Sequence, residues 1–202
     1  MNLFEKYKNK CFVETGSYKG DGIQKAIDAG FDKIISIEIT PKYYKLCKEK
    51  FQNNISVEVI EGDSVQLLKS IISKIDEPIT FWLDGHYVDE TTKFGDKLCP
   101  ILDEIDIIKD HVVKYGDTVL INDLRCWNKA NFFYRHYKFD VNDIINNLKF
   151  IDKYVKIDYE DGFVKNDILV AQFAARDIEE KTKPIKKIVK KRSGRPKSKK
   201  IK

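Results

Sequence analysis

Short apolar runs alternate along the chain with segments whose apolar residues recur at helical spacing. Between residues 63 and 75, for example, Leu67, Leu68, Ile71 and Ile72 fall on one face of a helix. The run KIISIEI at 33–39 has instead the compact apolar character of a buried strand. Compact apolar runs of this kind predict strands at 11–14, 33–39, 55–60, 79–83, 118–121, 154–159 and 168–173. Helical spacing predicts helices at 21–29, 41–51, 63–75, 100–113 and 141–148.

The order of these elements predicts the fold class. Strands that alternate with helices are typical of a parallel α/β sheet with helices on both faces. The last two strands are separated by the turn Glu160-Asp161-Gly162 and no helix, so we expect a closing hairpin and one antiparallel strand.

Length and composition narrow the class of protein. The 202 residues suit one domain with a tail, and no apolar run reaches the roughly 20 residues of a membrane-spanning helix. The first ten residues lack the pattern of a secretory signal. The four cysteines are scattered, which predicts free thiols in a reducing compartment. We therefore expect a cytoplasmic protein with no membrane insertion.

Charge divides the chain into two parts. Residues 176–202 hold 13 basic and 3 acidic residues, whereas the part before them holds 24 basic and 29 acidic residues. The basic segment has few apolar residues with which to build a core, so we expect a folded domain at 1–177 and a disordered tail at 178–202. Such a tail attracts polyanions, including nucleic acid, and three interpretations stay open: a nuclear import signal, a nucleic-acid contact or a solubilising segment.

Acidic residues stand at the carboxyl end of each of the first five predicted strands. They are Glu14, Glu38, Asp63, Asp84 and Asp123. Open α/β sheets bind their ligands at this edge, so the acidic side chains predict a ligand site there.

The loop after the first strand, ETGSYKGDG, indicates the kind of ligand. Its glycine spacing, G-x-x-x-G-x-G, differs from the G-x-G-x-x-G of dinucleotide-binding folds, and its carboxylates disfavour a pyrophosphate. S-adenosylmethionine has no phosphate and carries a sulfonium cation. Glu38, 22 residues after Gly16, is placed to accept hydrogen bonds from ribose hydroxyls, and Asp63 to reach the adenine amino group or to cap the next helix. The expected cofactor residues are Glu14, Gly16, Ser17, Gly20, Gly22, Glu38, Asp63, Ser64 and Asp84.

Four segments at these strand ends resemble the class I S-adenosylmethionine-dependent methyltransferases over residues 10–174. The segments are ETGSYKGDG, SIE, GDS and FWLDGHY. The resemblance implies a Rossmann-like, mostly parallel seven-stranded sheet whose last strand is antiparallel.

A narrower resemblance points to small methyltransferases that act on sugars. It rests on LDGHY, CPILDEI, VLINDLRCW and the DG…NDILVA hairpin. In the related metal-dependent sugar O-methyltransferases, acidic residues after the fourth and fifth strands bind magnesium, and those positions correspond to Asp84, Asn122 and Asp123. Asn122 stands where a second carboxylate is expected and brings no charge, so this resemblance implies a weak magnesium site or none.

These resemblances imply O-methylation of a sugar or glycan hydroxyl. Such a hydroxyl has a high pKa, so a base or a metal ion must assist, and Asp84, His86 and Asp123 are the expected catalytic residues. Two alternatives stay open: a nucleic-acid methyltransferase guided by the basic tail, and a non-catalytic cofactor-binding module. Both keep the fold.

Overall fold

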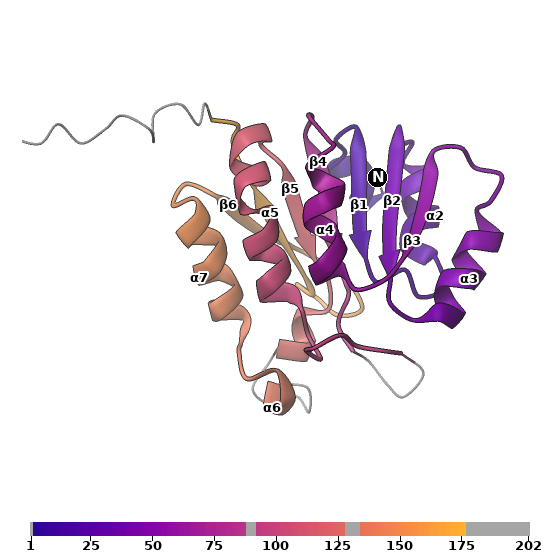
Figure 1. The fold of residues 1–202 in the computed structure, drawn as a ribbon. Helices are drawn as coiled ribbons and strands as arrows, with labels where there is room; N and C mark the ends of the chain where they lie inside the picture. The colour runs from indigo at the N-terminus through magenta and orange to yellow at the C-terminus, as the bar shows by residue number, and fades with distance from the viewer. Residues whose placement is uncertain (1, 88–91, 128–133, 177–202) are drawn as a thin grey trace, which may run out of the picture.

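The computed structural model describes residues 2–87, 92–127 and 134–176 (Figure 1). Within them one sheet of seven strands has the order β3-β2-β1-β4-β5-β7-β6. The strands are β1 Cys11–Thr15, β2 Lys33–Glu38, β3 Val57–Glu61, β4 Ile79–Leu83, β5 Thr118–Ile121, β6 Lys156–Glu160 and β7 Ile168–Gln172. Each lies within two residues of its predicted bounds.

Strand direction in the sheet confirms the predicted topology. The pairs from β3 through β5 are parallel, and β7 runs antiparallel to both β5 and β6. β1 has β2 on one side and β4 on the other, so the strand order reverses at β1 and opens a crevice at the carboxyl ends of β1 and β4.

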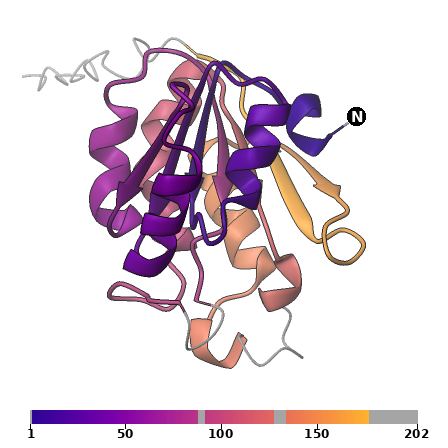
Figure 2. The ribbon, with the colours of Figure 1, turned by 90° about the vertical axis from the view of Figure 1, so that its right-hand side faces the viewer.

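Helices cover both faces of the sheet (Figures 1 and 2). Those predicted from the sequence are α2 Asp21–Asp28, α3 Pro41–Lys50, α4 Ser64–Ile72, α5 Ile101–Tyr115 and α7 Val141–Ile151. Their ends differ from the prediction by at most three residues. The sequence pattern did not predict the short helices α1 Leu3–Lys6 and α6 Tyr134–Tyr137, or the 3₁₀ turn η1 Leu124–Trp127.

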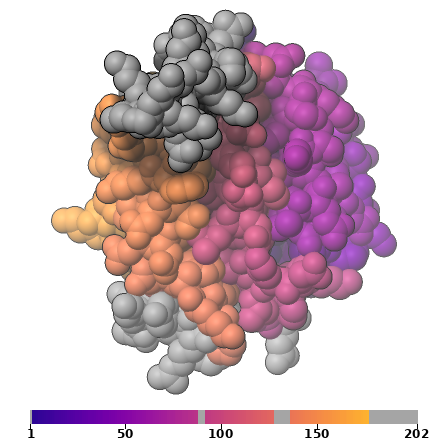
Figure 3. Space-filling model, turned by 60° about the vertical axis from the view of Figure 1, so that its left-hand side comes forward, coloured from indigo at the N-terminus to yellow at the C-terminus, as the bar shows by residue number. Residues whose placement is uncertain are grey.

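Successive strand residues pack alternately into two hydrophobic cores, one on each face of the sheet. Val13 and Phe81 belong to the core beneath α4, α5 and α7, which lie side by side in Figure 3. Their neighbours Phe12 and Trp82 belong to the core on the opposite face, with Phe4 of α1. All of these side chains are buried, so the sheet is apolar on both faces, as a doubly covered parallel sheet requires.

Two predictions about the whole chain have different outcomes. Among the described residues, no helix combines the length and the apolar character that crossing a bilayer demands. The predicted basic tail, 178–202, lies outside the described residues, so its disorder remains a prediction.

Candidate active site

A cavity of about 410 Å³ opens at the carboxyl edge of the sheet. Its volume is in the range of sites that enclose a small-molecule ligand. The predicted site residues that line it are Gly16, Glu38, Asp63, Ser64, Asp84, His86 and Asp123. The sheet therefore brings together residues that are more than 100 positions apart in the chain.

Gly16 brings the first loop into direct contact with the end of β4. It has φ +84°, and a Cβ atom there would lie 2.5 Å from the carbonyl oxygen of Asp84. That distance is shorter than any tolerated contact, and the backbone oxygen cannot rotate away, so only glycine fits. The glycine loop and Asp84 thus form one wall of the cavity.

Glu38 is buried at the end of β2, and its carboxylate is held by two backbone groups. The N–H of Tyr18 donates to Oε2 at 2.9 Å, and the N–H of Thr40 donates to Oε1 at 2.7 Å. A carboxylate has about four acceptor positions, so these two bonds leave capacity on both oxygens for a ligand's hydroxyl groups. The side chain is therefore fixed before any ligand arrives.

Asp63 and Ser64 line the same cavity from the start of α4. Asp63 caps this helix, since its Oδ1 accepts the N–H of Val65 at 2.9 Å, and this confirms the capping interpretation. Its other carboxylate oxygen, Oδ2, lies so close to Gly95 that a Cβ atom added to Gly95 would clash with it. Capping and ligand contact are compatible, because the two oxygens face different neighbours.

One wall of the cavity was missed by the sequence prediction. It is formed by residues 92–97, and it is joined to the β2 loop because the N–H of Lys93 donates to Thr40 Oγ1 at 2.9 Å. The segment has no helical or alternating apolar pattern. The available signal was the length of the connection between β4 and α5, because long connections in compact domains are often functional.

Glu14 lies beneath the glycine loop and not on the cavity surface. It is 1% exposed and accepts a hydrogen bond from Ser36 Oγ, which also contacts Ser17 Oγ. A Cβ atom on Gly22 would lie 1.8 Å from Glu14 Oε1, so glycine is required there as well. Glu14, Ser17, Gly20 and Gly22, all predicted to bind the cofactor, are not among the residues that line the cavity.

Burial raises the pKa of Glu14 from 4.5 to about 8. The hydrogen bond from Ser36 opposes this rise, whereas the nearby negative charges of Asp84, Glu38 and Asp21 add to it. Between these two pH values the unfolded chain loses a proton that the folded protein keeps, so stability falls as pH rises. We expect Glu14→Gln to match wild type near pH 5 and to be about 2 to 4 kcal/mol more stable at pH 8.5. Urea unfolding across this pH range measures the difference.

The control for this prediction is Glu61→Gln, at the exposed end of β3. It removes an exposed carboxylate and leaves Glu14 in place, so the fall in stability with rising pH should persist. An unchanged pH slope in Glu14→Gln would show that Glu14 is ionised in the folded protein at neutral pH.

Glu104 is a second buried acid near the site, and the sequence prediction did not single it out. It lies on α5 at 0% exposure, and its Oε1 accepts a hydrogen bond from Ser64 Oγ at 2.6 Å. Burial raises its pKa to about 7. The available signal was an acid on the apolar face of the helix beside Ile101, Ile105 and Ile108, where a charged residue needs a partner.

His86 lies between the two carboxylates that follow β4 and β5. Its Nδ1 is 3.6 Å from Asp84 Oδ1, and its Nε2 is 3.4 Å from Asp123 Oδ2. Burial by itself would lower the pKa of His86, but the hydrogen bond to Asp123 and the two negative charges raise it to about 10. Burial raises the pKa of Asp84 to about 6.

Asp123 has a constrained backbone and several partners. Its φ of +63° lies in the left-handed region, which residues other than glycine, asparagine and aspartate seldom adopt. Its Oδ1 accepts from Arg125 Nη1 at 2.6 Å, and the same guanidinium bonds Asp167. Burial would raise the pKa of Asp123, yet His86 and Arg125 together lower it.

The residues expected to bind magnesium come together but do not form an oxygen site. Leu83 pairs with Ile121, so Asp84, Asn122 and Asp123 leave the sheet side by side. However, Asn122 directs its amide nitrogen toward Asp84 Oδ2 at 3.2 Å, and the His86 ring lies between the two carboxylates. Magnesium requires octahedral oxygen coordination, which this arrangement does not provide.

Solved structures with the same architecture identify the fold. TomG, an O-methyltransferase of Streptomyces achromogenes solved with S-adenosylmethionine, superposes with a TM-score of 0.60 at 11% identity, over 86% of this chain and 77% of that one. The S-adenosylhomocysteine-bound methyltransferase PaMTH1 of Podospora anserina gives 0.56 at 16% identity, over 86% and 75%. The fold is that of the class I S-adenosylmethionine-dependent methyltransferases. Its cavity lies at the carboxyl edge of the methyltransferase sheet, where β1 and β4 adjoin.

Sequence comparison gives a shorter match. No protein-family model matches the chain. Ribosomal RNA small subunit methyltransferase A of Mycoplasma mycoides is 32% identical over 77 residues, which are 38% of this chain and 28% of that protein. The match thus spans little more than a quarter of the relative's length, and it agrees with the methyltransferase fold.

Proposed function

We propose that this protein transfers a methyl group from S-adenosylmethionine to an acceptor. The observation that carries the proposal is the cavity at the strand-order reversal, in which the anchored Glu38 carboxylate faces the same space as Asp63 and Asp84. We place the ribose at Glu38, the adenine beside Asp63 and Val65, and the sulfonium near Asp84. The surrounding carboxylates suit a cationic cofactor without phosphate groups.

The reaction needs alignment and removal of one proton. The acceptor oxygen attacks the sulfonium methyl group, the carbon–sulfur bond breaks, and the sulfur leaves as a neutral thioether. The acceptor's proton must then pass to a base. The expected catalytic residues included both Asp84 and His86, but the neighbouring carboxylates raise the pKa of His86 to about 10, so in the metal-free site it already carries a proton near neutral pH. We therefore propose that Asp84 accepts the proton and that His86 and Asp123 hold the Asp84 carboxylate in position.

A sugar or glycan hydroxyl is the acceptor we propose first. The support is the resemblance of the LDGHY and VLINDLRCW segments to sugar methyltransferases. The body of the chain before residue 176 carries an excess of acidic residues, which disfavours a phosphate backbone. Nucleic acid is the second candidate, and the identity with a ribosomal RNA methyltransferase favours it.

Two measurements on the full chain test the proposal. Calorimetric titration should show S-adenosylhomocysteine binding at one site per chain. Radiolabelled methyl transfer should then be screened over sugars, RNA and small phenols, and we expect incorporation into the sugars. Absence of S-adenosylhomocysteine binding would refute the cofactor proposal, and incorporation into RNA alone would replace the sugar by nucleic acid.

A further inference from the structure

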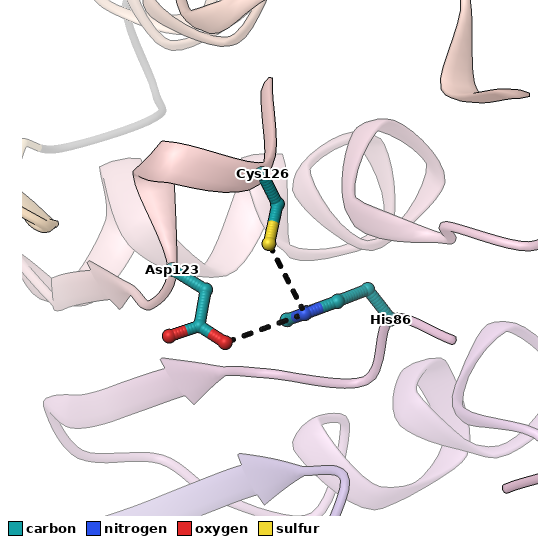
Figure 4. A group of neighbouring side chains, drawn as sticks. All are labelled: His86, Asp123 and Cys126. Carbon is teal, nitrogen blue, oxygen red and sulfur yellow. Dashed lines mark hydrogen bonds and ion pairs between the residues drawn. The ribbon is translucent and has the colours of Figure 1, made fainter. Parts of the chain in front are cut away.

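Three possible metal ligands of different chemistry converge at the cavity wall. His86 follows β4, Asp123 follows β5 directly before η1, and Cys126 belongs to η1 (Figure 4). His86 Nε2 lies 3.4 Å from Asp123 Oδ2 and 4.0 Å from Cys126 Sγ, and the three donor atoms all lie within 4.8 Å of one another.

These separations are close to those between the ligands of a tetrahedral metal ion. Bonds of about 2.1 Å to nitrogen and oxygen and about 2.3 Å to sulfur place the ligand atoms about 3.4 to 3.6 Å apart. The nitrogen and oxygen already have this separation. The sulfur lies 4.0 Å from the nitrogen and within 4.8 Å of the oxygen, so it would need to move closer to both, which a change in the cysteine side-chain torsion can supply.

Each of the three ligands is held by a neighbouring group, and in each case its donor atom still points toward the other two ligands. Asp84 Oδ1 lies 3.6 Å from Nδ1 of His86, on the side where a carboxylate holds the proton of a metal-binding histidine, and metal binding would displace the proton from Nε2. Arg125 bonds the other oxygen of Asp123. The backbone N–H of Cys126 donates to the carbonyl of Asp123 at 2.8 Å, which holds the thiol above the carboxylate.

The chemistry and burial of the set select the kind of metal. Cys126 and His86 are 5% and 8% exposed, and a nitrogen, oxygen and sulfur set suits zinc, whereas magnesium prefers oxygen ligands. His86 and Asp123 also line the cavity, so a fourth coordination position would face the ligand space. We propose that His86, Asp123 and Cys126 form a binding site for one zinc-class divalent cation, with its open position toward the cavity.

Cobalt(II) is the probe for this proposal, because a thiolate bound to cobalt gives a charge-transfer band that oxygen ligands do not give. The chelator-treated full chain should bind one equivalent of Co²⁺ with this band and with the intense visible bands of four-coordinate cobalt. One equivalent of Zn²⁺ should remove both, and millimolar Mg²⁺ should not. This readout needs no substrate, so it is independent of the proposed methyl transfer.

Variants assign the ligands. Cys126→Ser and Cys126→Ala should abolish the charge-transfer band, whereas the matched control Cys99→Ser, at a cysteine of similar burial (6%), should retain it. Asp84→Asn should weaken Co²⁺ binding about 10- to 100-fold through His86. Thermal melting without metal identifies any variant that fails to fold. Cobalt binding without the band, a band that survives in both Cys126 variants, or displacement by Mg²⁺ would each overturn the proposal.

Discussion

Replacing Glu38 by alanine is expected to weaken S-adenosylhomocysteine binding by about 2 to 4 kcal/mol, or roughly 30- to 1,000-fold. Two charge-assisted hydrogen bonds to the ribose would disappear. The substitution also removes the acceptor for the Tyr18 and Thr40 N–H groups, so the loops on both sides of the ribose position lose their anchor. Isothermal titration calorimetry measures the change.

Two further variants separate these effects. Glu38→Gln keeps one oxygen acceptor and the shape of the side chain, so its loss should be smaller than that of Glu38→Ala. Glu61 is the residue opposite Glu38 in the pairing of β2 with β3, and its side chain is exposed. Glu61→Ala should therefore bind S-adenosylhomocysteine as tightly as wild type. Unchanged affinity in Glu38→Ala would remove the cofactor from this cavity.

Replacing Asp84 by asparagine is expected to slow methyl transfer about 100-fold or more. Asparagine preserves the shape of the side chain but cannot accept the acceptor's proton as a carboxylate does. We expect S-adenosylhomocysteine affinity to change less than tenfold, because the backbone contact with Gly16 remains. Initial rates in the presence of a chelator, together with calorimetry, measure both quantities.

The matched control is Asp103→Asn. Asp103 also lines the cavity, but its carboxylate is paired with Lys97 at 2.6 Å, so this substitution should leave the rate within a few-fold of wild type. A similar loss in both variants would indicate a general effect of the cavity's negative charge and would remove the specific role of Asp84.

Most of the fold could be predicted because its signals are local. The run at 33–39 and the helical spacing of Leu67, Leu68, Ile71 and Ile72 each report burial within one element. The short turn η1 has no repeating pattern to detect. Its position depends on tertiary contacts, since the N–H of Leu124 donates to the carbonyl of Asp167, more than 40 residues away.

The strand ends predicted where the site lies, but they did not predict which of their side chains face the cavity. Glu14 and Glu38 both end strands, yet Glu14 points beneath the loop and Glu38 lines the cavity. Strand order also placed Asp84 near Asp123, but it could not show that the His86 ring fills the space between them. Such details depend on side-chain directions that the sequence pattern does not encode.

The buried titratable groups at this edge change how the whole molecule should behave on an ion-exchange column. The formal net charge of +5 counts every acid as ionised and every histidine as neutral. Burial raises the pKa of Glu14 and of Glu104, and the neighbouring carboxylates raise that of His86, so the metal-free folded protein at pH 7 carries more positive charge than this count. The folded protein should therefore elute from a cation exchanger at higher salt than its composition indicates.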